Sequence, residues 1–328
     1  MTLYELVRES RPTLRDSDRL TPDHPLRPYP PLAPLRASAG LRAGAFAVVL
    51  VTTLLLATSV AWAIAGSYTL SPTSFVPLLD ELIAAIVAYG VLVFVMEARL
   101  RPYELLPRRA PGLLKGGLVG AVCISVAVGL LALVGVYRIT GVNPAYDPWT
   151  DLLTLGLAAA VAEEIIFRGV LFRLVEEGVG TWGAVAVSAL VFGLLHLTNS
   201  EATVWGAVAI AVEAGILFAA VYVITRSLWW CIGLHFAWNV MEGPVFGSVV
   251  SGAGTQESWF VSTWTGPDWL TGGQFGLEAS VVPVILLGAL GVALLLVARH
   301  AGIIVSPMWV RKRILSPGPA APAPGPAR

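Results

Sequence analysis

The sequence predicts an all-α fold, a polytopic membrane bundle of about eight transmembrane helices. Of its 328 residues, 56% are hydrophobic and 13% are charged, whereas a soluble domain carries about 25% charged residues. The mean hydropathy is +0.76. The formal net charge is zero, so no global basic field favours nucleic acid as a partner.

Besides composition and mean hydropathy, a series of apolar segments predicts this fold. Most of them are close to the roughly 20 residues that a helix needs to cross a bilayer. The seventh is short and interrupted by polar residues, so we expect a partial or tilted span there. The eight segments run approximately over residues 42–66, 77–98, 112–137, 149–175, 181–198, 203–225, 228–242 and 279–299.

The transmembrane domain therefore covers residues 41–300, between two polar tails. Residues 1–40 are rich in Arg and Pro and lack an apolar core, which predicts a disordered cytoplasmic tail and no signal peptide. Residues 301–328 form a second cytoplasmic tail, Pro/Ala-rich at its end. The two cysteines, Cys123 and Cys231, lie in apolar runs and predict no disulfide framework.

Lys and Arg predict the orientation, because positive loops stay on the cytoplasmic side. If every segment spans, the basic residues of both tails, of the loop after the second segment and at Arg226 fall on one side. The opposite loops 67–76 and 243–278 contain none, and Arg138 is the exception. We therefore expect both termini to be cytoplasmic, in an integral protein of a bacterial or archaeal plasma membrane.

Two local patterns concern helix packing and the outer surface. Gly112, Gly116 and Gly120 recur at four-residue spacing and predict close helix packing within the bundle. Three tryptophans in the loop 243–278 predict an interfacial segment on the outer surface: Trp259, Trp264 and Trp269.

The fourth apolar segment carries three charged residues, which makes it a functional candidate because charges are costly inside a membrane. Glu164 and Arg168 are four residues apart, so they share a helix face and can pair. Glu163 points about 100° away from Glu164. A buried ion pair that fixes packing would explain one carboxylate, but the second needs another explanation.

Two further segments carry polar residues at four-residue spacing. The fifth ends with Phe192 and His196. Taken alone, this histidine is explained by a hydrogen bond to a helix carbonyl, and the phenylalanine by core packing. The seventh carries His235 and Asn239, which could serve as interhelical hydrogen-bonding groups.

Together these three motifs resemble the CPBP family of CAAX proteases and bacteriocin-processing enzymes, which includes the Ras-converting CAAX endopeptidase. The motifs are Glu163-Glu164-x-x-x-Arg168, Phe192-x-x-x-His196 and His235-x-x-x-Asn239, in order and each on its own apolar segment. The resemblance covers about residues 149–242, the expected catalytic core.

The resemblance implies an intramembrane glutamic endopeptidase that hydrolyses a peptide bond with a Glu-activated water and no cofactor. It implies Glu163 as general base, His196 as its partner in holding the water, and His235 and Asn239 as the groups that stabilise the oxyanion. Glu164, Arg168 and Phe192 are implied as supporting residues. The substrate is expected to be a membrane-associated peptide or protein, in a cavity open to the cytoplasm or laterally to lipid.

Other mechanisms remain open. Glu163, His196 and His235 are also ligand types for zinc, although HExxH is absent. A cysteine mechanism would pair Cys231 with His235, but no cationic neighbour that would activate the thiol is visible.

Functions without peptide hydrolysis also remain. A non-catalytic membrane scaffold or an immunity or regulatory protein could share this polar core. A proton-coupled transporter could use its Glu and His. Substrate identity, prenylation and oligomeric state do not follow from the sequence.

Overall fold

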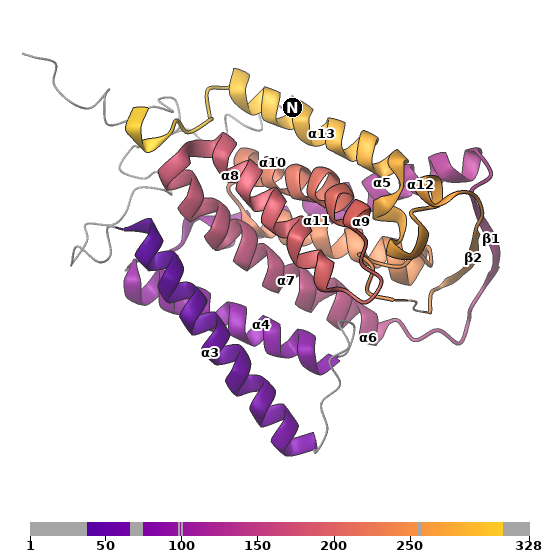
Figure 1. The fold of residues 1–328 in the computed structure, drawn as a ribbon, viewed down its shortest axis with the longest axis horizontal. Coiled ribbons are helices and arrows are strands. Elements are labelled where there is room, and N and C mark those ends of the chain that lie inside the picture. Colours follow the sequence, from indigo (N-terminus) through magenta and orange to yellow (C-terminus); the bar gives the residue numbers. More distant parts are fainter. Residues whose placement is uncertain (1–37, 66–74, 98, 100, 255–256, 311–328) are drawn as a thin grey trace, which may run out of the picture.

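A computed structural model describes residues 38–65, 75–97, 99, 101–254 and 257–310. Its described part is an all-α polytopic bundle, as predicted, and Figure 1 shows the long helices running side by side. The first 37 residues of the predicted N-terminal tail and the Pro/Ala-rich end of the C-terminal tail lie outside the described ranges.

The helices follow the predicted apolar segments, and several contain π-helical stretches. The first three are α3 (Ala39–Ala65), α4 (Phe75–Gly90, continued by π-helical Val91–Met96) and α5 (Pro111–Leu133). The central run comprises α6 (Trp149–Asp151), α7 (Ala159–Glu164) and α8 (Arg173–Leu195), joined by π-helical Leu152–Ala158 and Ile165–Phe172. The remainder are α9 (Val204–Ile210), α10 (Ile216–Thr225), α11 (Leu228–Val240, continued by π-helical Met241–Val245), α12 (Asp268–Thr271) and α13 (Val281–His300).

The count of eight membrane spans stays a prediction. Within the described residues, six helical runs are long and apolar enough to cross a membrane. One of them, Trp149–Thr198, is 50 residues long and contains the fourth and fifth predicted segments. The seventh predicted segment forms α11 but is not among the six.

Gly180 separates the fourth and fifth segments by breaking the helical backbone. Its φ of 77° and ψ of 177° are non-helical, and a Cβ there would lie 2.6 Å from the Val305 carbonyl oxygen. Only glycine adopts this conformation without strain. The break lets the chain reverse, so that His196 returns toward the level of Glu163.

A two-stranded antiparallel ribbon was not predicted. Strand β1 (Tyr137–Val142) pairs with β2 (Phe260–Trp264), and both come from segments expected to be loops. The ribbon lies at the right-hand end of Figure 1, beside α12. Trp264 packs on Tyr137 with ring centroids 4.7 Å apart, and its indole donates to the Gly247 carbonyl.

The glycine pattern of α5 brings it into direct contact with α11, as the spacing predicts. A Cβ on Gly116 would lie 2.1 Å from the Trp230 carbonyl oxygen, and one on Gly120 would lie 2.4 Å from that of Leu234. No larger residue fits this approach without separating the two backbones. The close packing fixes the position of α11, which carries His235.

Candidate active site

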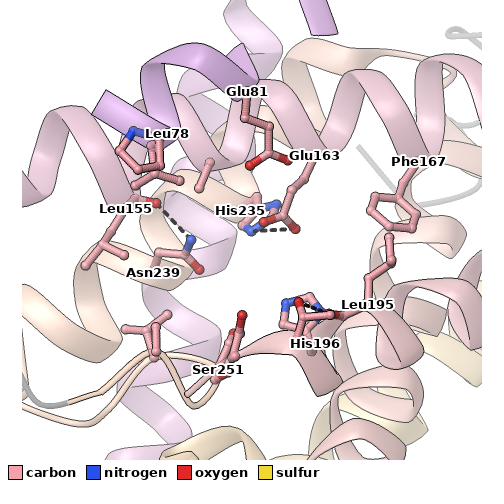
Figure 2. A pocket seen from close by; sticks show the side chains of 16 residues that line it. Leu78, Glu81, Leu155, Glu163, Phe167, Leu195, His196, His235, Asn239 and Ser251 are labelled. Carbon is pink, nitrogen blue, oxygen red and sulfur yellow. Dashed lines mark hydrogen bonds and ion pairs between the residues drawn. The ribbon is translucent and has the colours of Figure 1, made fainter. Parts of the chain in front are cut away.

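The four residues predicted to act in catalysis line one cavity of about 360 Å³. Figure 2 shows Glu163 and His235 facing each other, with Asn239 and His196 around the same space. The rest of the wall combines apolar side chains with four further polar ones, and the polar groups converge on the cavity as in a typical ligand site. The other lining residues are Pro77, Leu78, Glu81, Leu155, Ala159, Phe167, Leu195, Thr198, Asn199, Val250, Ser251 and Ala253.

The two adjacent glutamates have different surroundings. Glu164 is fully buried and accepts a hydrogen bond of 2.8 Å from Arg168, which confirms the predicted i,i+4 pair. The Glu163 side chain keeps 22% of its surface exposed and faces the cavity. Helix α7 presents both from a short α-helical turn between two π-helical stretches, an irregularity frequent at functional sites. Glu163 is thus the carboxylate that can contact water.

His235 lies between the two glutamates. Its Nδ1 is 3.0 Å from Oε1 of Glu164, and its Nε2 is 4.0 Å from Oε2 of Glu163. Because Glu164 is an acceptor already paired with Arg168, we assign the Nδ1 proton to His235, donated to Glu164. The Nε2 atom is then directed toward the cavity. Glu164 and Arg168 therefore orient the imidazole without lining the cavity themselves.

His196 is held by its own helix end. Its Nδ1 lies 2.7 Å from the Phe192 carbonyl oxygen, so Nδ1 carries the proton and donates it. The neutral ring then has a lone pair at Nε2. Phe192 is buried and stacks near this imidazole, with ring centroids 4.6 Å apart. This is the hydrogen bond to a helix carbonyl that the sequence suggested for His196 taken alone. It also holds the imidazole ring at the cavity wall.

Asn239 is positioned by the π-helical stretch that precedes α7. Its Nδ2 donates a 2.8 Å hydrogen bond to the Leu155 carbonyl oxygen. The second proton of this amide is not used by that bond. Asn239 lines the cavity one helical turn beyond His235, so both side chains face the same space.

Four polar lining residues were missed by sequence reasoning: Glu81, Thr198, Asn199 and Ser251. Glu81 enters from the first turns of α4, and Figure 2 shows its carboxylate close to Glu163. As a charged residue in an apolar segment, it carried the same signal as Glu163. Asn199 and Ser251 come from the segments after α8 and α11 and are joined by a 2.7 Å bond from Asn199 Nδ2 to the Ser251 carbonyl. No sequence pattern marks these two.

Ser251 connects the cavity to a second buried carboxylate. Its hydroxyl donates a 2.7 Å hydrogen bond to Glu278, which also accepts one from the Trp238 indole. Burial raises the pKa of Glu278 to about 7, although both hydrogen bonds act to lower it. Glu278 precedes α13 and was not singled out from the sequence.

Among the described residues, no three His, Cys, Asp or Glu side chains are arranged to hold a metal ion. Glu163, His196 and His235, the alternative zinc ligands, line the cavity without converging on one point. Cys231 is fully buried and is not among the lining residues.

A carboxylate, two imidazoles and an amide around one cavity in a membrane bundle are the groups used by a membrane-embedded hydrolase. Residues 145–241 match the family model described as type II CAAX prenyl endopeptidase Rce1-like. This match confirms the resemblance to the CPBP family over the segment that carries all three motifs. It supports a CAAX-type membrane protease in general terms. No curated protein and no solved structure matches the chain.

Proposed function

We propose that this protein is a CAAX-type intramembrane glutamic endopeptidase that hydrolyses a peptide bond of a membrane-associated protein or peptide. One observation carries the proposal: Glu163, His196, His235 and Asn239 line a single cavity, and Glu163 is the exposed member of the two glutamates. The family match over residues 145–241 supports the same reaction class.

In this mechanism, a water lies between Glu163 and His196. Glu163 accepts one water proton as general base, while Nε2 of His196 accepts a hydrogen bond from the other. The water oxygen forms a bond to the scissile carbonyl carbon, and the carbonyl electron pair moves onto its oxygen. The C–N bond then breaks, and Glu163 returns its proton to the leaving amine, giving a carboxylic acid and an amine.

The developing oxyanion is stabilised by two side chains of α11. The free proton of the Asn239 amide is one donor, and His235 is the other when its Nε2 carries a proton. Glu164 accepts from Nδ1 of His235 and so orients the ring, and Arg168 holds Glu164 in place. No step of this mechanism passes through a metal.

The test is proteolysis in proteoliposomes with fluorogenic peptides, each made with and without a lipid anchor. The wild type is compared with Glu163→Gln, and both are assayed with and without a strong zinc chelator. We expect cleavage that survives the chelator and is lost in Glu163→Gln. Cleavage lost to the chelator and restored by zinc would replace this mechanism with the zinc alternative.

The scaffold alternative predicts a different result. Binding of a partner without turnover, unchanged in Glu163→Gln, would contradict the endopeptidase assignment. Glu177→Gln is a control for removal of a carboxylate outside the cavity, since Glu177 contacts Arg42 at 2.5 Å and is not among the lining residues.

A further inference from the structure

The bundle has one Arg-rich end, and direct contacts bring its basic residues together. Glu97, at the end of α4, accepts from Arg42 of α3 at 2.8 Å and from Arg173 of α8 at 2.7 Å. Arg109, just before α5, donates a 2.6 Å hydrogen bond to the Thr225 carbonyl at the end of α10. We call this the Arg-rich end; its described basic residues are Arg42, Arg99, Arg101, Arg108, Arg109, Lys115, Arg173, Arg226 and Arg299.

The cavity lies toward the other end. Its lining comes from the first turns of α4, the 3-10 turn His196–Thr198 that follows α8, and the segment 250–253. The last two are joined by the bond from Asn199 to Ser251 and by a 2.8 Å bond from the Glu201 N–H to the Gly252 carbonyl. The β1–β2 ribbon belongs to this end, on the right of Figure 1.

The charge at this end contrasts with the Arg-rich end. Arg138 is its one described basic residue, and no Lys or Arg is among the residues that line the cavity. Among the residues that line the cavity, those that carry or can carry charge are Glu81, Glu163, His196 and His235. Positive residues mark the cytoplasmic ends of membrane helices. The Arg-rich end is then cytoplasmic and the cavity faces the opposite aqueous phase.

We propose that the active-site cavity takes its substrate from the outer, non-cytoplasmic face of the membrane. This differs from the expectation of a cytoplasmic opening that the family resemblance carries. That the cavity binds a substrate rests on the proposed function. The position of the cavity relative to the Arg-rich end does not depend on catalysis.

The lining also defines the chemistry of the substrate. A free C-terminal carboxylate close to the scissile bond would lie near Glu81 and Glu163, and no Lys or Arg among the lining residues could pair with it, which is unfavourable in a low-dielectric cavity. A basic or neutral segment fits better. The substrate class is therefore a membrane-anchored polypeptide cleaved at an internal bond close to the outer surface, with uncharged or basic residues around that bond.

The experiment is site-specific labelling with a membrane-impermeant maleimide in right-side-out and inside-out vesicles. Ala253→Cys places a thiol in the cavity lining without touching the proposed catalytic residues. Trp269→Cys and Arg108→Cys, both at exposed positions, report the outer end and the Arg-rich end. Wild type provides the background, since Cys123 and Cys231 are buried.

We expect Ala253→Cys and Trp269→Cys to be labelled in right-side-out vesicles and protected in inside-out vesicles, and Arg108→Cys to show the reverse. Labelling of Ala253→Cys from the same face as Arg108→Cys would overturn the proposal. Protection of Ala253→Cys from both faces, with the two end markers labelled from opposite faces, would overturn it as well, because the cavity would be closed to outside water. None of these results depends on activity, so an inactive protein still tests the inference.

The charge preference is tested with two lipid-anchored peptides that differ by Lys or Glu beside the scissile bond, presented at the outer face. Faster cleavage of the Lys peptide is expected. Equal rates, or faster cleavage of the Glu peptide, would contradict the assigned substrate chemistry while leaving the labelling result intact.

Discussion

The two ends of the bundle hold their buried carboxylates in opposite ways. At the Arg-rich end, Glu97, Glu104 and Glu176 each face at least one guanidinium, and Glu176 binds Arg226 through two hydrogen bonds. Toward the cavity end, neither oxygen of Glu213 has a hydrogen-bond partner among the described residues, and Glu278 accepts only from neutral donors. Paired carboxylates stabilise helix packing, whereas unpaired ones are available to exchange protons.

Two adjacent residues of the candidate site show the same contrast between their carboxylates. Glu164 is paired with Arg168, and Glu163 faces the cavity. Within one helical turn, the structure therefore holds one carboxylate paired with a guanidinium and one that faces the cavity, and the second is the proposed general base.

The largest effect is expected for Glu163→Gln. Loss of the general base should lower kcat/KM for a lipid-anchored peptide by about 10²–10⁴-fold. Stability should change little, because among the described residues the ion-pair partner of Glu163 is His235, whose Nε2 lies 4.0 Å away. Cleavage kinetics in proteoliposomes and thermal unfolding in detergent measure the two quantities. Glu164→Gln is the matched variant: it should lower stability as well, since Arg168 and His235 lose their partner. Equal stability loss in the two variants would contradict the division of roles.

Removing a carboxylate should cost more stability at the Arg-rich end than toward the cavity end. Glu176→Gln leaves the buried guanidinium of Arg226 without its counter-charge and should lower the free energy of unfolding by about 3–5 kcal/mol. Glu213→Gln removes no ion pair or hydrogen bond in the described residues and should change it by less than about 1 kcal/mol. Unfolding by SDS titration in mixed micelles gives both values. A larger loss in Glu213→Gln than in Glu176→Gln would reverse the comparison.

The ends should also differ in how pH affects stability. Glu278 has a pKa of about 7 in the folded protein, raised by burial from an ordinary value of 4.5. Between these values the folded protein binds more protons than the unfolded chain, so its contribution falls as pH rises from 4.5 to 7. The change should be on the order of 1–3 kcal/mol, and Glu278→Gln should flatten it. A slope unchanged in that variant would show that Glu278 is not responsible.

Glu104 should make stability depend on pH in the opposite direction, and in a lower pH range. Burial acts to raise the pKa of Glu104, but Arg99 and Arg173 outweigh it and lower that pKa to about 2. The folded protein then binds fewer protons than the unfolded chain between 4.5 and 2, and stability is lost as pH falls through this range. Glu104→Gln should remove that acid-dependent component. Unfolding midpoints measured from pH 2 to pH 7 cover both windows.

The smallest effect is expected for Glu81→Gln. This change removes one of the two carboxylates that line the cavity and keeps the shape of the side chain. We expect a few-fold rise in KM for a peptide with Lys beside the scissile bond, since a solvated charge pair contributes under about 1 kcal/mol. The KM for a neutral peptide should stay the same. A loss of turnover comparable to that of Glu163→Gln would instead make Glu81 a catalytic residue.

Much of the fold could be predicted from the sequence because lipid imposes simple rules. The apolar segments had to become helices, since the backbone has no water to bond in the membrane. The glycine spacing on α5 predicted close packing, and Gly116 does lie against Trp230 of α11. The β1–β2 ribbon escaped prediction because its strands lie more than a hundred residues apart, and short alternating segments carry a weak signal.

The residues of the candidate site also fall into those that could be predicted from the sequence and those that could not. Charges in an apolar segment made Glu163, Glu164 and Arg168 candidates. The resemblance of the three motifs to the CPBP family then added Phe192, His196, His235 and Asn239. Glu81 carried the signal of an intramembrane charge but no spacing partner. Ser251, Asn199 and Glu278 could not be found, since their significance depends on contacts between segments far apart in the chain.

The sequence by itself determined that this is a membrane protein, where its helices lie, and which four side chains are candidates for catalysis. Burial in lipid selects composition locally, which reveals the membrane segments. The four side chains followed from the resemblance of the three motifs to the CPBP family. The tertiary structure alone decided which glutamate faces the cavity, which residues join it, and at which end of the bundle the cavity lies. Those properties depend on the rotation and mutual depth of separate helices, and packing against neighbours sets both.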